Sequence, residues 1–145
     1  MAVALLNETL LSYVHRRNQI SVETVRLQNQ KSLATSETSD LADWKAAQYS
    51  ALRAECKNIF ATTYEHNDKY SYSDYTEIPE YQDEVEYIDS YYEAEVADLN
   101  AWETQIDNQI SMLSVELQEI NAFQESFKSY LKDNISNDYQ YAEGM

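Results

Sequence analysis

The chain has almost none of the residues that turn a backbone sharply. Its 145 residues include one glycine, Gly144, and one proline, Pro79. Glycine is the usual residue where a backbone turns tightly, caps a helix in the left-handed conformation or approaches a ligand closely. Phosphate-binding loops, dinucleotide loops and the G-x-S-x-G nucleophile turn all need internal glycines. The sequence therefore excludes these kinds of site.

Cysteine is equally scarce. Cys56 is the only one, so a disulfide within the chain is excluded. We expect Cys56 to be a small buried residue of a helix. A disulfide between chains or a reactive thiol is the alternative.

Long apolar runs are missing as well. No run reaches the ~18 apolar residues of a membrane-spanning helix, so we predict no membrane span. The first residues, MAVALLNETLLSYVHRR, place their positive charge after the apolar stretch, which is the reverse of a secretory signal. We therefore expect no cleaved signal peptide.

Groups that carry out chemistry are few. The two histidines are His15, which precedes two arginines, and His66, which lies among carboxylates. The segment around His66 lacks both the alternating oxygen ligands and the glycine of a calcium-binding EF-hand loop. No arrangement of acids suggests a pocket that would separate two pKa values. We predict no catalytic residue, no cofactor site and no metal site, and hence a protein that is not an enzyme.

The net charge is −16 and is unevenly distributed. Residues 1–57 hold seven basic and six acidic residues, a net +1, whereas residues 58–145 hold three and twenty, a net −17. This balance argues against nucleic acid and anionic membranes as partners. The two halves are expected to attract each other, within a chain or between copies. The alternative is that the acidic half is simply solvated.

What remains is the composition of long helices, and we predict an all-α, extended antiparallel hairpin in one domain, residues 1–145. The first helix is expected over residues 2–63. A spacing of seven runs through Tyr13, Ile20, Leu27, Ala34 and Leu41, which is one of the two seam positions of a coiled coil. The other seam position is occupied by polar residues. Because residues 32–40 are rich in serine and threonine, we expect a weak point or a short break at 35–40.

The helical period is lost over residues 64–78, which predicts a connector. Pro79 then stands where a helix begins, followed by Glu80 and other acids that suit the positive end of its dipole. The second helix is expected over 79–134. Residues 135–145 have no period and are predicted to form a tail.

The second helix carries the strongest pattern in the chain, with apolar residues that alternate three and four apart. Trp102, Phe123 and Tyr130 widen this stripe, which favours contacts with further helices, including those of other copies. Glu103, Gln124 and Asn134 are polar positions in it, and they either fix the register or open the seam to solvent. The predicted assembly seam comprises Val96, Leu99, Ile106, Ile110, Leu113, Leu117, Ile120, Phe127, Leu131, Leu6, Leu10, Tyr13, Ile20 and Leu27.

The segment 64–92 holds eight of the 13 tyrosines together with many acids. A tyrosine ring is rigid and apolar with a polar hydroxyl, which suits protein-binding surfaces. Alternatively, the tyrosines pack on their own helix ends. The candidate interaction surface comprises Tyr70, Tyr72, Tyr75, Tyr81, Tyr87, Tyr91 and Tyr92.

The amphipathic helix at residues 2–34 and the helix ISMLSVELQEINAFQESFKSYL at 110–131 give the chain a pattern that resembles the helical-hairpin subunits of bacterial filaments. These include type III secretion needle and translocation-filament proteins and the coiled-coil ends of flagellins. The resemblance implies that the two terminal helices pair and polymerise. It also implies secretion without a cleaved signal, or a place in an assembled particle, rather than a cytoplasmic protein. The long, acidic, tyrosine-rich connector and the C-terminal aromatics depart from those subunits.

Three functions remain open. The first is a structural subunit that self-assembles into a filament or other particle, with copies of itself as partners. The second is a heteromeric adaptor or chaperone that binds a protein partner through the acidic, tyrosine-rich segment; an acidic decoy of nucleic acid is a third. Ile110, Leu113, Leu117 and Ile120 are expected to be buried, and a change at Glu116 is expected to matter much less than one at Leu117.

Overall fold

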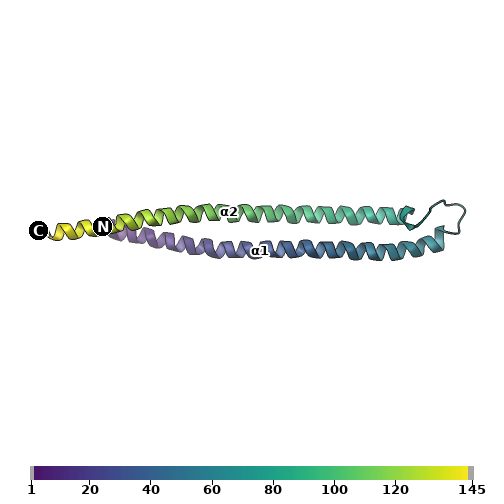
Figure 1. Ribbon diagram of the computed structural model, residues 1–145, viewed down its shortest axis with the longest axis horizontal. Coiled ribbons are helices and arrows are strands. Elements are labelled where there is room, and N and C mark those ends of the chain that lie inside the picture. The colour runs from purple at the N-terminus through teal and green to yellow at the C-terminus, as the bar shows by residue number, and fades with distance from the viewer. Residues whose placement is uncertain (1, 144–145) are drawn as a thin grey trace. The chain divides into compact units, whose positions relative to one another are not determined.

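The computed structural model describes residues 2–143, and side chains from position 4 to position 136. Helix α1 spans Ala2–Ile59 and continues into one π-helical turn, η1, at Phe60–Tyr64. A short 3-10 turn, η2, at Tyr75–Glu77 precedes helix α2, which spans Pro79–Glu143. The described residues contain no strand. The predicted all-α antiparallel hairpin is confirmed (Figure 1).

Of the two alternatives expected at residues 35–40, a weak point or a short break, the break does not occur, because α1 is helical throughout this stretch. The hydroxyl of Thr38 donates to the carbonyl oxygen of Ala34 at 3.0 Å. Its hydrogen-bonding capacity is thus used within the helix instead of capping an end. Ala34 is fully buried beside it, so packing outweighs the weak helix preference of the serines and threonines.

The helix ends also differ from the expected ones. The helical turns after α1 run to Tyr64, so the connector begins one residue later than expected. Helix α2 does not end at residue 134 but continues to Glu143 through most of the expected tail. Since residues 135–143 contain neither glycine nor proline, nothing in them stops a helix that is already formed. The last two residues of that tail lie outside the described residues.

The chain packs as two compact units, and each is described by itself. The first, which we call the terminal unit, pairs α1 up to Lys31 with α2 from Gln105 onwards. Its contacts are antiparallel: Tyr13 packs on Phe123 and Phe127, Arg16 pairs with Glu116, and Lys31 Nζ lies 2.7 Å from Asp107 Oδ1. The most deeply buried side chains in this unit come from both helices: Ile20, Leu27, Ile106, Ile120 and Gln124.

The second, which we call the connector unit, comprises Ser32–Thr104. Its core joins Leu52 and Cys56 of α1 to Ile78 and to Ile88 of α2. Half-buried aromatic side chains surround these four residues. They are Trp44, Tyr49, Phe60, Tyr64, Tyr72, Tyr75 and Tyr81.

The connector reverses the chain without a left-handed residue. Asp74 caps η2 by accepting a hydrogen bond from the Thr76 amide at 2.9 Å. Ile78 is extended (φ −72°, ψ 147°), the conformation that a following proline favours, and its side chain is fully buried. The buried Ile78 and the adjacent Pro79 thereby anchor the start of α2 on the core of the connector unit.

Candidate interaction surfaces

The residues of the predicted assembly seam are all buried or half-buried within the chain itself. Ile20, Leu27, Ile106 and Ile120 are buried. Among the four central residues, only Ile120 is buried, and Ile110, Leu113 and Leu117 are half-buried. The other half-buried positions are Val96, Leu99, Phe127, Leu131, Leu6, Leu10 and Tyr13. These side chains contribute to packing within the monomer, and the half-buried ones keep part of their surface exposed to solvent.

Two of the three polar residues in the seam have hydrogen-bond partners. Gln124 is 4% exposed, and its amide oxygen accepts a hydrogen bond from Arg17 at 3.1 Å. Arg17 lies on α1 at one of the polar positions that accompany the apolar spacing of seven. A buried amide left without its partner costs free energy, so this pair favours one register of the terminal unit over its neighbours. In the connector unit Glu103 accepts from the hydroxyl of Thr35 at 3.4 Å.

Glu116, on the flank of the stripe, forms an ion pair that the pattern of α2 does not indicate. The guanidinium of Arg16 donates to both carboxylate oxygens, from Nε at 2.6 Å and from Nη2 at 2.8 Å. These hydrogen bonds lower the pKa of Glu116 and raise the pKa of Arg16. A fork of this kind fixes orientation more than it adds stability at an exposed site. Arg16 and Glu116 are one hundred residues apart in sequence, so the α2 pattern alone gave no sign of their pairing.

The terminal unit exposes many large hydrophobic side chains outside the seam. Val22 and Val25 lie three residues apart on α1, and Met112 and Val115 lie three apart on α2; Met112 is 72% exposed. Residues three apart share a helix face. Sequence analysis did not single out these pairs, although their spacing was a usable signal. The exposed set, which we call the outer apolar set, is Leu5, Leu11, Val22, Val25, Met112, Val115, Phe123, Tyr130 and Ile135.

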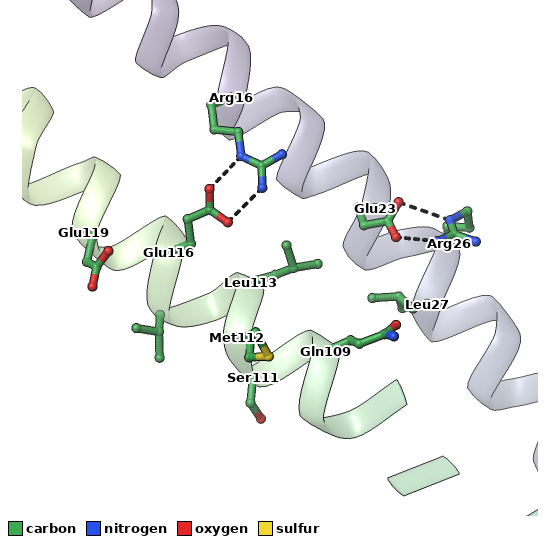
Figure 2. Close-up of a pocket in the computed structure, with 11 residues that line it drawn as sticks. Arg16, Glu23, Arg26, Leu27, Gln109, Ser111, Met112, Leu113, Glu116 and Glu119 are labelled. Carbon is green, nitrogen blue, oxygen red and sulfur yellow. Dashed lines mark hydrogen bonds and ion pairs between the residues drawn. The ribbon is translucent and has the colours of Figure 1, made fainter. Parts of the chain in front are cut away.

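An open groove of about 780 Å³ adjoins this set within the terminal unit. Figure 2 shows Leu27 of α1 and Leu113 of α2 facing it, with Met112 beside Leu113. The Arg16–Glu116 pair bridges the two helices at one side, and Glu23 pairs with Arg26 along α1. The groove is therefore apolar along its floor and charged at its rim, which is how protein interfaces are commonly built.

The tyrosines of the predicted interaction surface fall into two groups. Tyr72, Tyr75 and Tyr81 pack against the core of the connector unit, and the ring of Tyr92 lies 4.4 Å from Lys45 Nζ. These inward tyrosines match the alternative in which the rings pack on their own helix ends. The outward group, which remains exposed, is Tyr70, Tyr87 and Tyr91.

Two tyrosines outside the predicted interaction surface donate hydrogen bonds to carboxylates. The hydroxyl of Tyr49 donates to Asp89, and that of Tyr64 donates to Glu80 at 2.7 Å. Each hydrogen bond, with some desolvation, raises the pKa of its tyrosine to about 12. Both contacts cross from α1 or its π-turn to α2, so they help to close the connector unit.

Cys56 is buried in the core of the connector unit, as its expected role as a small helix residue requires. Burial raises the pKa of its thiol, and the carboxylates of Glu55, Glu80 and Glu84 raise it further. A protonated, enclosed thiol is a poor nucleophile. Among the described residues, no three His, Cys, Asp or Glu side chains are grouped to hold a metal ion.

No helix in the described part of the chain is both long and apolar enough to cross a membrane. Comparisons with protein-family models, with curated proteins and with solved structures found no match to this chain. The function must therefore be argued from the surface of the hairpin.

Proposed function

We propose that this protein is a non-enzymatic structural subunit that self-assembles through its terminal unit into a filament or another multi-subunit particle. The observation that carries the proposal is the outer apolar set beside the open groove. Apolar side chains that recur on the outside of a helix pair mark surfaces that other helices cover.

The charge distribution supports the same surface. The terminal unit has six basic and nine acidic residues, a net −3, whereas the connector unit has four and seventeen, a net −13. Like charges repel when copies are brought together, so copies associate at lower electrostatic cost through the terminal unit. A second copy that places an apolar helix face on Met112 and Val115 covers side chains that a monomer leaves in water.

The resemblance to helical-hairpin filament subunits agrees with this proposal in two respects. Those subunits polymerise through their paired terminal helices, and here the terminal helices form one unit with an apolar outside. If the resemblance extends to secretion, the particle assembles outside the cell, and its subunits leave the cell without a cleaved signal.

The test compares the wild type with Met112→Glu/Val115→Glu by sedimentation velocity and negative-stain electron microscopy. Both side chains are exposed in the monomer, so circular dichroism should show unchanged helix content. We expect the wild type to form large species and the variant to remain a monomer or small oligomer, because two carboxylates would have to be desolvated in the interface.

The matched control is Leu33→Glu/Tyr87→Glu in the connector unit, where both side chains are also exposed. This variant adds the same charge and should assemble as the wild type does. A wild type that stays monomeric at high concentration would refute the proposal. Equal loss of assembly in both variants would refute its assignment to the terminal unit.

A further inference from the structure

A small pocket on the connector unit combines aromatic rings with carboxylates. The rings of Trp44 and Tyr91 are 4.9 Å apart and inclined by 53°. They line a cavity of about 220 Å³ together with Leu41, Glu37 and Asp40. Glu37 and Asp40 are exposed on α1, and Tyr91 is 41% exposed on α2. The five lining residues thus include two carboxylates and no basic side chain.

This combination of groups attracts a cation that has an apolar stem. The face of an aromatic ring attracts ammonium and guanidinium groups, and tryptophan is the strongest of the rings. A carboxylate beside the ring adds a hydrogen-bond acceptor and opposite charge. The methylenes of lysine or arginine can pack on apolar surface while the charged group reaches the acids.

The connector unit already uses the same chemistry within the chain. Lys45 Nζ lies 4.4 Å from the centre of the Tyr92 ring and 5.9 Å from that of Tyr49, and it is 3.6 Å from Asp89 Oδ1. Lys57 and Lys69 lie over Tyr75 and Tyr70 in the same manner, at 5.5 and 5.7 Å. Three of the four basic residues in this unit are therefore placed on tyrosine rings.

We propose that the pocket formed by Trp44, Tyr91, Glu37 and Asp40 binds a lysine or arginine side chain from a basic segment of a partner protein. The net charge of −13 on the connector unit draws such a segment to this unit, and the pocket selects one side chain from it. This site is independent of the apolar surface of the terminal unit.

A second copy of this chain is a poorer occupant than a basic protein. Four of the six basic residues of the terminal unit are already engaged within the chain: Arg16 with Glu116, Arg17 with Gln124, Arg26 with Glu23 and Lys31 with Asp107. The connector unit of another copy would bring seventeen acids with it. Charge complementarity therefore favours a different, basic chain.

The experiment uses Trp44 as the reporter. The chain has two tryptophans, so the Trp102→Phe variant retains Trp44 as its single tryptophan fluorophore. In this background, capped hexapeptides that alternate lysine with serine, or arginine with serine, are titrated at low and at physiological salt. We expect saturable quenching or a shift of the Trp44 emission, weaker at higher salt, and no change with a serine-only peptide.

Three variants in the same background locate the site. Tyr91→Leu removes one ring and should weaken peptide binding about three- to fivefold. Glu37→Gln/Asp40→Asn should weaken it about five- to tenfold. The matched control, Glu86→Gln/Glu93→Gln, removes the same charge from α2 positions that lie roughly 140–160° around the helix from Tyr91, and it should change binding twofold or less.

Three results would overturn the proposal. Equal weakening by both charge-neutralising variants would mean that the peptides respond to the net charge of the unit and not to the pocket. Self-association that falls in Glu37→Gln/Asp40→Asn but not in the control would mean that the occupant is a second copy. Unchanged Trp44 emission on peptide binding would overturn it as well.

Discussion

The terminal unit and the connector unit are built from the same two helices, yet they differ in what surrounds their buried aliphatic residues. The connector unit packs seven half-buried aromatic residues around Leu52, Cys56, Ile78 and Ile88 and exposes many acids on its outside. The terminal unit buries a thin row of aliphatic residues and leaves its outer apolar set in water. The connector unit covers its core with its own side chains, so it does not need a neighbouring chain for stability. The terminal unit leaves large apolar side chains in water, so it gains stability when another chain covers them.

Under the proposed self-assembly, this difference would give the two units separate tasks. Two helices alone form a narrow interface, and bundles of more helices bury wider apolar stripes. The terminal unit is therefore the part whose stability should depend on protein concentration. The connector unit should have the same stability in the free and the assembled protein.

The largest expected effect comes from Leu117→Asp in the terminal unit. Leu117 is half-buried on the apolar stripe, and a carboxylate there would be desolvated on an already acidic helix. We expect a loss of more than about 3 kcal/mol in the free energy of unfolding, together with a loss of assembly. Thermal unfolding followed by circular dichroism, with sedimentation velocity, measures both.

Gln118→Asp is the matched control for this change. Gln118 is the next residue and is exposed, so the same charge is added outside the helix contact. It should change stability by no more than about 0.5 kcal/mol. If both variants melted and assembled as the wild type does, packing along this stripe would not hold the terminal unit together.

The next effect separates the two units. Ile78→Ala would leave a cavity at a fully buried position in the core of the connector unit, at a cost of about 2–4 kcal/mol. We expect faster amide hydrogen exchange over residues 75–92 with an unchanged oligomer size. Leu33→Ala, which truncates an exposed side chain of the same unit, should leave exchange unchanged. A smaller oligomer in Ile78→Ala would contradict the independence of the two units.

The smallest effect is electrostatic and depends on pH. The pKa of Glu116 is lowered from 4.5 in the folded chain by its hydrogen bonds to Arg16. The stability that this shift contributes is present above about pH 4.5 and is lost as the pH falls through the lowered pKa. Glu116→Gln should therefore melt slightly below the wild type at pH 7, and the difference should vanish in acid.

The control for the pH experiment is Glu119→Gln, which removes one charge less than one turn away and leaves the Arg16–Glu116 pair intact. At pH 7 its melting temperature should equal or slightly exceed that of the wild type, because the change removes a negative charge from an acidic chain without breaking an ion pair. If both variants showed equal differences at every pH, the effect would come from net charge and not from the pair.

The hairpin could be predicted from sequence because its signals are local. The three-and-four spacing of residues such as Ile106 and Ile120, and the proline at position 79, report on their own helices. The sequence left open whether the helix is continuous or broken at 35–40, because the burial of Ala34 depends on a partner helix distant in sequence. Arg16 and Glu116 could not be paired for the same reason, since the register of two helices is a tertiary property.

The tyrosines illustrate the same limit within one segment. Tyr81 and Tyr87 are six residues apart on α2, yet Tyr81 packs on the core and Tyr87 is 60% exposed. Composition marks the segment as aromatic and acidic but does not say which rings turn inward. That depends on where α1 lies, so only the outward residues Tyr70, Tyr87 and Tyr91 could be assigned to a surface after the fold was known.

The way in which the chain reverses direction bears on how this protein can evolve. None of the described residues has a positive φ angle, and the connector has no cis peptide bond. No connector position therefore requires glycine for its backbone conformation. Exposed connector residues such as Ser71 and Ser73 can therefore be exchanged for other residues at the cost of side-chain contacts alone. Lineages of this protein can diversify their exposed connector residues while the two helices stay paired.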